Sequence, residues 1–129
     1  MTLLAQCIIG KYHQIMKKIK DVEINIAKDF GIYPGARYRS DGDFSGEEFY
    51  EDILKPKFEE VLSAGDSSLS INFDGTYGYA SSFISEVFIR LVKDFKDKKL
   101  IKSKMELITT DDPFLERAIW QIINETQVT

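Results

Sequence analysis

Three segments of the chain alternate between apolar and polar residues, and each alternation predicts a β-strand with one buried face. The segments cover about residues 22–26, 69–73 and 104–107. A strand covered on both faces would instead read as a near-continuous apolar run. The alternation therefore predicts a sheet with helices packed on one face and a more polar opposite face.

Apolar residues at helical spacing predict three helices between and after these strands. The first opens at Ser45, with a glutamate three residues later as in a capping box, and Pro56 predicts a kink or a break within it. The second has the widest apolar stripe, from Phe83 to Phe95. The third begins at Asp112, which is followed by proline at the first helical position.

The order of these elements predicts the architecture. Strands that alternate with helices indicate parallel strands joined by right-handed crossovers. We therefore expect an α/β fold, a two-layer sandwich whose mostly parallel or mixed sheet has four strands and helices on one face. The fourth strand is a short one over residues 36–39, paired at the sheet edge. The domain spans residues 20–129, and residues 1–19 form an N-terminal appendage, a short helix or a leader.

Composition narrows the classes of function. The chain of 129 residues has 17 Lys and Arg against 21 Asp and Glu, and this net charge of -4 gives no bulk attraction for nucleic acid or an anionic membrane. The N-terminal apolar run is shorter than the roughly 20 residues of a membrane helix. The single Cys and the single His exclude an intramolecular disulfide, a zinc site of their own and a Ser–His–Asp set. We expect a cytoplasmic, non-enzymatic domain without metal or cofactor.

Two loops beyond the carboxyl ends of the predicted strands, residues 28–46 and 74–82, concentrate the residues suited to recognition. Six of the eight glycines lie in them, and neither contains a His or Cys nucleophile, which favours binding over catalysis. The candidate partner-binding or ligand-binding residues of these loops are Arg37, Arg39, Asp74, Tyr77 and Tyr79.

The same segments resemble a known family. The stretches that carry the resemblance are residues 24–30, 34–37, 42 with 45–49, 73–75 and 81–88. As a set they are similar to the bacterial STAS-like domain family of unknown function, over roughly residues 20–125. That family is named for its similarity to the STAS fold of bacterial anti-sigma factor antagonists. Those antagonists are small switch proteins, which a partner ATPase of the histidine-kinase-like fold phosphorylates on Ser or Thr.

The resemblance implies a protein-interaction or regulatory switch module whose partner is an ATPase of the histidine-kinase-like fold. In the antagonists the phosphorylated helix opens with Asp-Ser-Ser-Gly or Asp-Ser-Thr-Gly, and the matching stretch here is residues 80–83. Ser82 is the closer counterpart of the phosphorylated residue, and Ser81 is the second candidate. Ala80 and Phe83 stand where the antagonists have Asp and Gly.

Each of these candidates also has an ordinary structural explanation. Ser82 at a helix amino end caps the helix by accepting a backbone N–H. Arg37 and Arg39 pair either with a phosphate or with acidic neighbours. Tyr77 and Tyr79 form an exposed contact loop or pack within a turn. The alternative function is a small-molecule or anion-sensing domain that binds through the two arginines. The acidic neighbours of the arginines are Asp41, Asp43 and Glu47.

Overall fold

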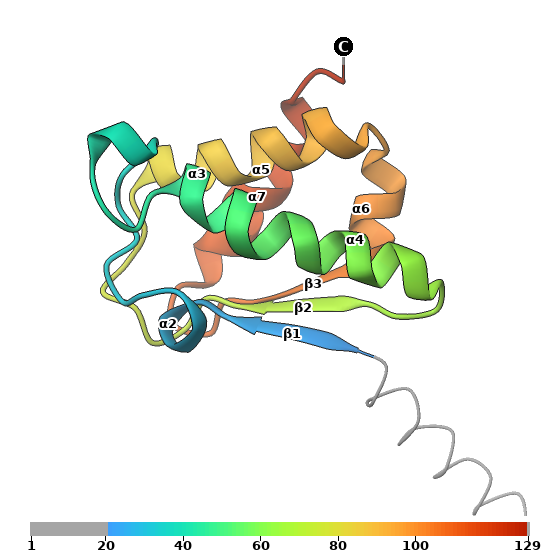
Figure 1. Cartoon of the computed structure of the whole chain (residues 1–129), viewed down its shortest axis with the longest axis horizontal. Helices are drawn as coiled ribbons and strands as arrows, with labels where there is room; N and C mark the ends of the chain where they lie inside the picture. The colour runs from blue at the N-terminus through green and yellow to red at the C-terminus, as the bar shows by residue number, and fades with distance from the viewer. Residues whose placement is uncertain (1–20, 129) are drawn as a thin grey trace, which may run out of the picture.

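The structure, a computed structural model, is described here for residues 21–128, and it contains a three-stranded parallel sheet (Figure 1). The strands are β1 (Val22–Asn25), β2 (Leu69–Asn72) and β3 (Met105–Ile108), in that spatial order. Each of the three follows closely the segment in which apolar and polar residues alternate. The appendage predicted for residues 1–19 lies outside the described residues.

Six α-helices, one 3-10 turn and one π-helical segment are found in the described part of the chain. The α-helices are α2 (Ile26–Asp29), α3 (Gly46–Phe49), α4 (Lys55–Ala64), α5 (Ser81–Phe95), α6 (Lys98–Lys104) and α7 (Pro113–Glu125). A 3-10 turn covers Arg39–Asp41, and a π-helical segment, Tyr50–Leu54, joins α3 to α4. Within residues 21–128, no helix is both long enough and apolar enough to cross a membrane.

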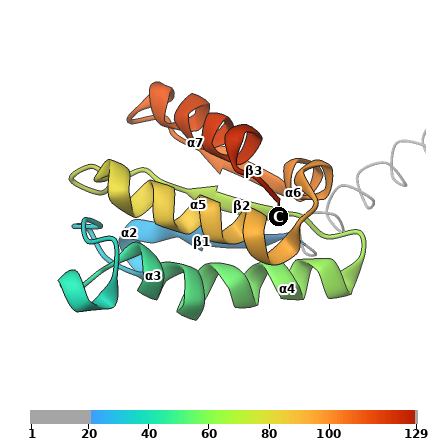
Figure 2. The same cartoon turned by 90° about the horizontal axis from the view of Figure 1, so that it is seen from above.

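Helices α4, α5 and α7 cover one face of the sheet, as the alternation predicts (Figures 1 and 2). In the register of the sheet, Ile24 pairs with Ile71, which pairs with Leu107, and all three side chains are buried beneath the helices. The neighbouring row of paired residues is Glu23, Ser70 and Glu106. This row lies on the opposite face, because successive side chains of a strand point to opposite faces.

The prediction of a fourth strand is wrong for the described residues. Residues 36–39 pair with no strand, because their backbone serves the start of α3 instead. The carbonyl oxygens of Ala36 and Arg37 accept the backbone N–H groups of Gly46 and Glu47 at 2.8 and 3.0 Å. These first N–H groups of a helix have no partner within the helix. The loop carbonyls therefore cap α3 and are not free for a sheet edge.

The predicted helix signals are confirmed at three positions. The Ser45 hydroxyl accepts the backbone N–H of Glu48 at 3.0 Å and caps α3. The Asp112 carboxylate accepts the N–H of Phe114 at 3.2 Å and caps α7. The irregularity expected at Pro56 takes the form of the π-helical segment immediately before α4. A wider turn there accommodates a residue that has no N–H to donate to the preceding turn.

Candidate functional site

The loops that follow the three strands meet at the carboxyl edge of the sheet (Figure 1). The backbone N–H of Tyr77 donates to the carbonyl of Ile32 at 2.9 Å, which joins the first loop to the second. The Asp74 carboxylate accepts the N–H of Asp111, and the Asp111 carboxylate accepts the N–H of Gly75, both at 2.9 Å. This reciprocal pair joins the second loop to the third, so Asp74 holds the loops of the edge together.

Two tyrosines form an exposed platform on these loops. The rings of Tyr33 and Tyr77 stack with centroids 4.9 Å apart and an interplanar angle of 8°. Their exposed fractions are 62% and 77%, so the stack stays largely open to solvent. Sequence reasoning selected Tyr77 but missed Tyr33, whose only signal was its place in the first glycine-rich loop. We call this pair the tyrosine platform.

Tyr79 has a different role from Tyr77. Its hydroxyl donates to the carbonyl of Phe73 at 2.8 Å, and its ring packs on Phe73 and Phe83 at centroid distances of 5.4 and 5.9 Å. Of the two explanations given by the sequence, turn packing therefore holds for Tyr79, and an exposed position holds for Tyr77.

The environment of Tyr79 predicts a pH dependence of stability. Burial is the main influence that raises the pKa of Tyr79 to about 12, and the Asp74 and Asp111 carboxylates act in the same direction. The hydrogen bond with Thr76 lowers this pKa and offsets part of the shift. An unfolded chain has a tyrosine pKa of about 10. The stabilisation from protonated Tyr79 is thus present below about pH 10 and is lost as the pH rises through 12.

We therefore expect Tyr79→Phe to be less stable than the parent chain by about 1 kcal/mol at neutral pH, the value of one hydrogen bond. The gap should shrink above about pH 10, where the parent loses its advantage. Urea unfolding at a series of pH values measures both free energies. Tyr77→Phe is the control and should follow the parent. A gap that stays constant to high pH would contradict the assignment.

Ser81 and Ser82 are the first two residues of α5, and neither is its cap. The N-cap is Ala80, whose carbonyl accepts the N–H groups of Phe83 and Ile84 at 3.1 and 3.3 Å, and no side chain caps the helix. The expected capping role of Ser82 is therefore wrong. The Ser81 side chain is exposed, whereas Ser82 is half-buried with its hydroxyl 3.5 Å from the Gly35 carbonyl.

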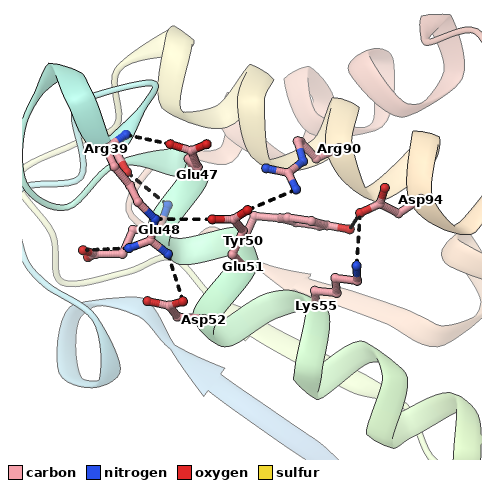
Figure 3. A network of polar contacts seen from close by, with 10 residues as sticks. Arg39, Glu47, Glu48, Tyr50, Glu51, Asp52, Lys55, Arg90 and Asp94 are labelled. Atoms are coloured by element: carbon pink, nitrogen blue, oxygen red, sulfur yellow. Dashed lines mark hydrogen bonds and ion pairs between the residues drawn. The ribbon is translucent and has the colours of Figure 1, made fainter.

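Arg39 lies among carboxylates of the helix that α3 begins (Figure 3). Its guanidinium lies 3.7 Å from Glu48, 3.3 Å from Glu51 and 2.9 Å from Asp52, and its backbone N–H donates to Glu47 at 2.9 Å. The hydrogen bond with Asp52 is the largest influence that raises the pKa of Arg39. The guanidinium thus pairs with acidic residues, but none of them is among the expected partners, since Glu47 accepts only the backbone N–H.

The same network continues across to α5 (Figure 3). Glu51 also pairs with Arg90 at 3.4 Å, and the Arg90 guanidinium lies 4.9 Å from the centre of the Tyr50 ring. The Tyr50 hydroxyl donates to Asp94 at 2.6 Å, and Asp94 lies 3.8 Å from the ammonium of Lys55. Burial, followed by the hydrogen bond with Asp94, raises the pKa of Tyr50. This chain of contacts fastens the helix of residues 46–64 to α5.

Arg37 differs from Arg39. It is half-buried, and it forms no ion pair with any carboxylate of residues 21–128. The Arg37 carbonyl accepts the N–H of Glu47, which fixes the backbone at this position. The guanidinium has no carboxylate partner among residues 21–128. The described residues also contain no cluster of three or more His, Cys, Asp or Glu side chains suited to a metal ion.

The parallel sheet, the helices on one face and the loops gathered at one edge define a two-layer α/β domain. A family model described as a STAS-like domain of unknown function (DUF4325) matches residues 45–115, more than half of the chain. The chain belongs to this STAS-like family. β1 and most of the first loop, with Arg37 and Arg39, lie outside the matched residues. No curated protein and no solved structure matches the chain.

Proposed function

We propose that this domain is a non-enzymatic protein-interaction module that binds its partner through the loops at the carboxyl edge of the sheet. The observation that carries the proposal is the tyrosine platform. Two large side chains, 62% and 77% exposed, are held in one stacked geometry. Tyrosine is enriched at protein interfaces and among the residues that dominate their binding energy. A preformed aromatic surface loses little entropy when it binds.

We further propose that the module is a switch controlled by phosphorylation at the start of α5. A phosphate at a helix amino end is favoured by the helix dipole, and no side chain caps α5. The greater exposure of Ser81 supports it over Ser82, the position that the resemblance to anti-sigma factor antagonists favours. That resemblance also supplies the class of partner that we propose, an ATPase of the histidine-kinase-like fold.

An anion-sensing role for the first loop is the weaker proposal. The Arg39 guanidinium already lies within 4 Å of three carboxylates, so an incoming anion would have to displace them. Of the two arginines, only Arg37 would then be available to such a site.

The interaction is tested by comparing what the chain captures in its own cells. We expect an ATPase of the proposed fold to be enriched with the parent chain. The double variant Tyr33→Ala, Tyr77→Ala should reduce that enrichment by at least about tenfold, since truncated central aromatics commonly cost more than 1.4 kcal/mol. Glu106→Ala, on the opposite face of the sheet, is the control and should capture as the parent does. Equal capture by the double variant would refute the platform as the binding surface.

The switch is tested by the intact mass of the chain recovered from its cells, with mapping of the modified residue. We expect a species heavier by one phosphate that disappears in Ser81→Ala or in Ser82→Ala. Ser81→Asp and Ser82→Asp should then alter the capture of the partner, because a negative charge at the rim of the site attracts or repels the charged groups of the partner. The absence of phosphate under all growth conditions would end the switch proposal and leave the interaction proposal standing.

A further inference from the structure

Helices α5 and α7 lie side by side over the sheet (Figure 2), and residues of both helices line two hollows, which together we call the groove. The hollows have volumes of about 270 and 450 Å³, and Ile122 lines both of them. The first hollow lies toward the amino ends of the helices, where Ile84, Leu115 and Ala118 line it. Phe114, whose side chain is 76% exposed, also lines this hollow. Phe114 therefore adds to a contiguous apolar surface, and exposed apolar surface of this kind is a candidate for binding.

The charges along the groove differ between its two ends. Asp112 is the charged residue that lines the first hollow, and it also lines the adjoining pocket that contains Asp74 and Asp111. Neither lining includes a Lys or Arg. The second hollow has both Lys93 and Glu125 at its edge. The amino end of the groove is therefore acidic, and its carboxyl end is balanced.

We propose that this groove binds an amphipathic helix of the partner protein, with a Lys or Arg of that helix placed beside Asp112. The inference rests on the proposed function, because it names the second surface that the same partner would use. The 13 residues of α7 give the groove a length of about 20 Å. A helix that presents apolar residues at positions i, i+4 and i+7 can fill hollows spaced along such a groove. The acidic end selects partner helices with a basic end.

The groove also connects to the proposed switch. Ser81 lines its first hollow together with Asp112. A phosphate on Ser81 adds charge of the same sign as Asp112, so modification strengthens the attraction for the basic end of the helix. The switch would then tighten binding in the groove. A modification that weakened it would contradict this geometry.

The test uses the purified chain and a displayed library of helical peptides about 14 residues long, which is the length of the groove at 1.5 Å per residue. We expect the enriched peptides to share an apolar stripe of helical period and a Lys or Arg at one end. Ala118→Arg places a charged side chain in the first hollow and should weaken the enriched peptides at least about 30-fold. Asn124→Arg, exposed on the same helix and outside both hollows, should bind them as the parent does.

Two further variants test the charge argument without disturbing the helix ends. Asp112→Asn keeps an N-cap residue while removing the charge and should weaken the peptides about threefold. Ser81→Asp should strengthen them by a similar factor of about three. Peptides without the helical stripe, or peptides indifferent to Ala118→Arg, would overturn the proposal. A dimer of the chain that Ala118→Arg dissolves would overturn it too, since the occupant would then be a second copy. These outcomes do not depend on the cellular partner, so they separate the groove from the tyrosine platform.

Discussion

Phe83→Ala is expected to lower the free energy of unfolding by about 3–5 kcal/mol, the usual cost of emptying a buried phenylalanine site. Phe83 is 1% exposed and contacts both glycine-rich loops at the start of α5. Its ring packs on Phe30 of the first loop, on Phe49 of α3 and on Tyr79 of the second loop, at centroid distances of 6.1, 5.9 and 5.9 Å. Urea unfolding followed by circular dichroism measures the loss.

The matched control is Phe114→Ala, which removes the same side chain from a position that is 76% exposed. Its effect on stability should stay within about 0.5 kcal/mol, as for most surface substitutions. A loss below about 1.5 kcal/mol for Phe83→Ala would mean that the loops hold together without this ring. The variant should also disturb the tyrosine platform. Phe83 packs on Tyr79, which lies two residues after Tyr77 in the second loop.

The parts of the fold that the sequence predicts are those fixed by local chemistry. The alternation of the strands, the hydroxyl of Ser45 and the Asp112–Pro113 pair each act within a few residues, so one stretch of sequence carries the whole signal. The irregularity predicted at Pro56 is also present, although the sequence did not predict that it would be a π-helical segment.

The parts that the sequence did not predict depend on contacts between distant residues. The stack of Tyr33 on Tyr77 requires the first two strand ends to meet, and the Asp74–Asp111 exchange requires the last two to meet. The prediction of a fourth strand failed for the same reason. The carbonyls of residues 36 and 37 accept hydrogen bonds from the start of α3, at residues 46 and 47. A helix boundary misplaced by two residues likewise made Ser82 a cap, whereas the structure caps α5 at Ala80.

Gly46→Val is expected to lower the free energy of unfolding by about 3 kcal/mol, at the upper end of the usual cost of overpacking. At Gly46, α3 lies close against the first turns of α5. A Cβ atom on it would lie 2.7 Å from the backbone oxygen of Phe83 and 3.1 Å from the Cβ of Glu86. The first of these neighbours is backbone and has no rotamer to change, so the two helices must separate. Gly46→Ala should show a smaller loss in the same direction, because alanine gains up to about 1 kcal/mol over glycine in a helix.

Gly35→Ala is the matched control for Gly46→Ala, since it adds the same Cβ atom in the neighbouring loop. The nearest atom to a Cβ on Gly35 is the Tyr33 carbonyl oxygen at 4.0 Å, so we expect a change within about 0.5 kcal/mol. Unfolding in urea compares the free energies of Gly46→Val, Gly46→Ala and Gly35→Ala with that of the parent. Equal stability of Gly46→Val and the parent would show that α3 can shift away from α5 without cost. In that case the close approach of α3 to α5 would not be what holds the carbonyls of residues 36 and 37 near the amino end of α5.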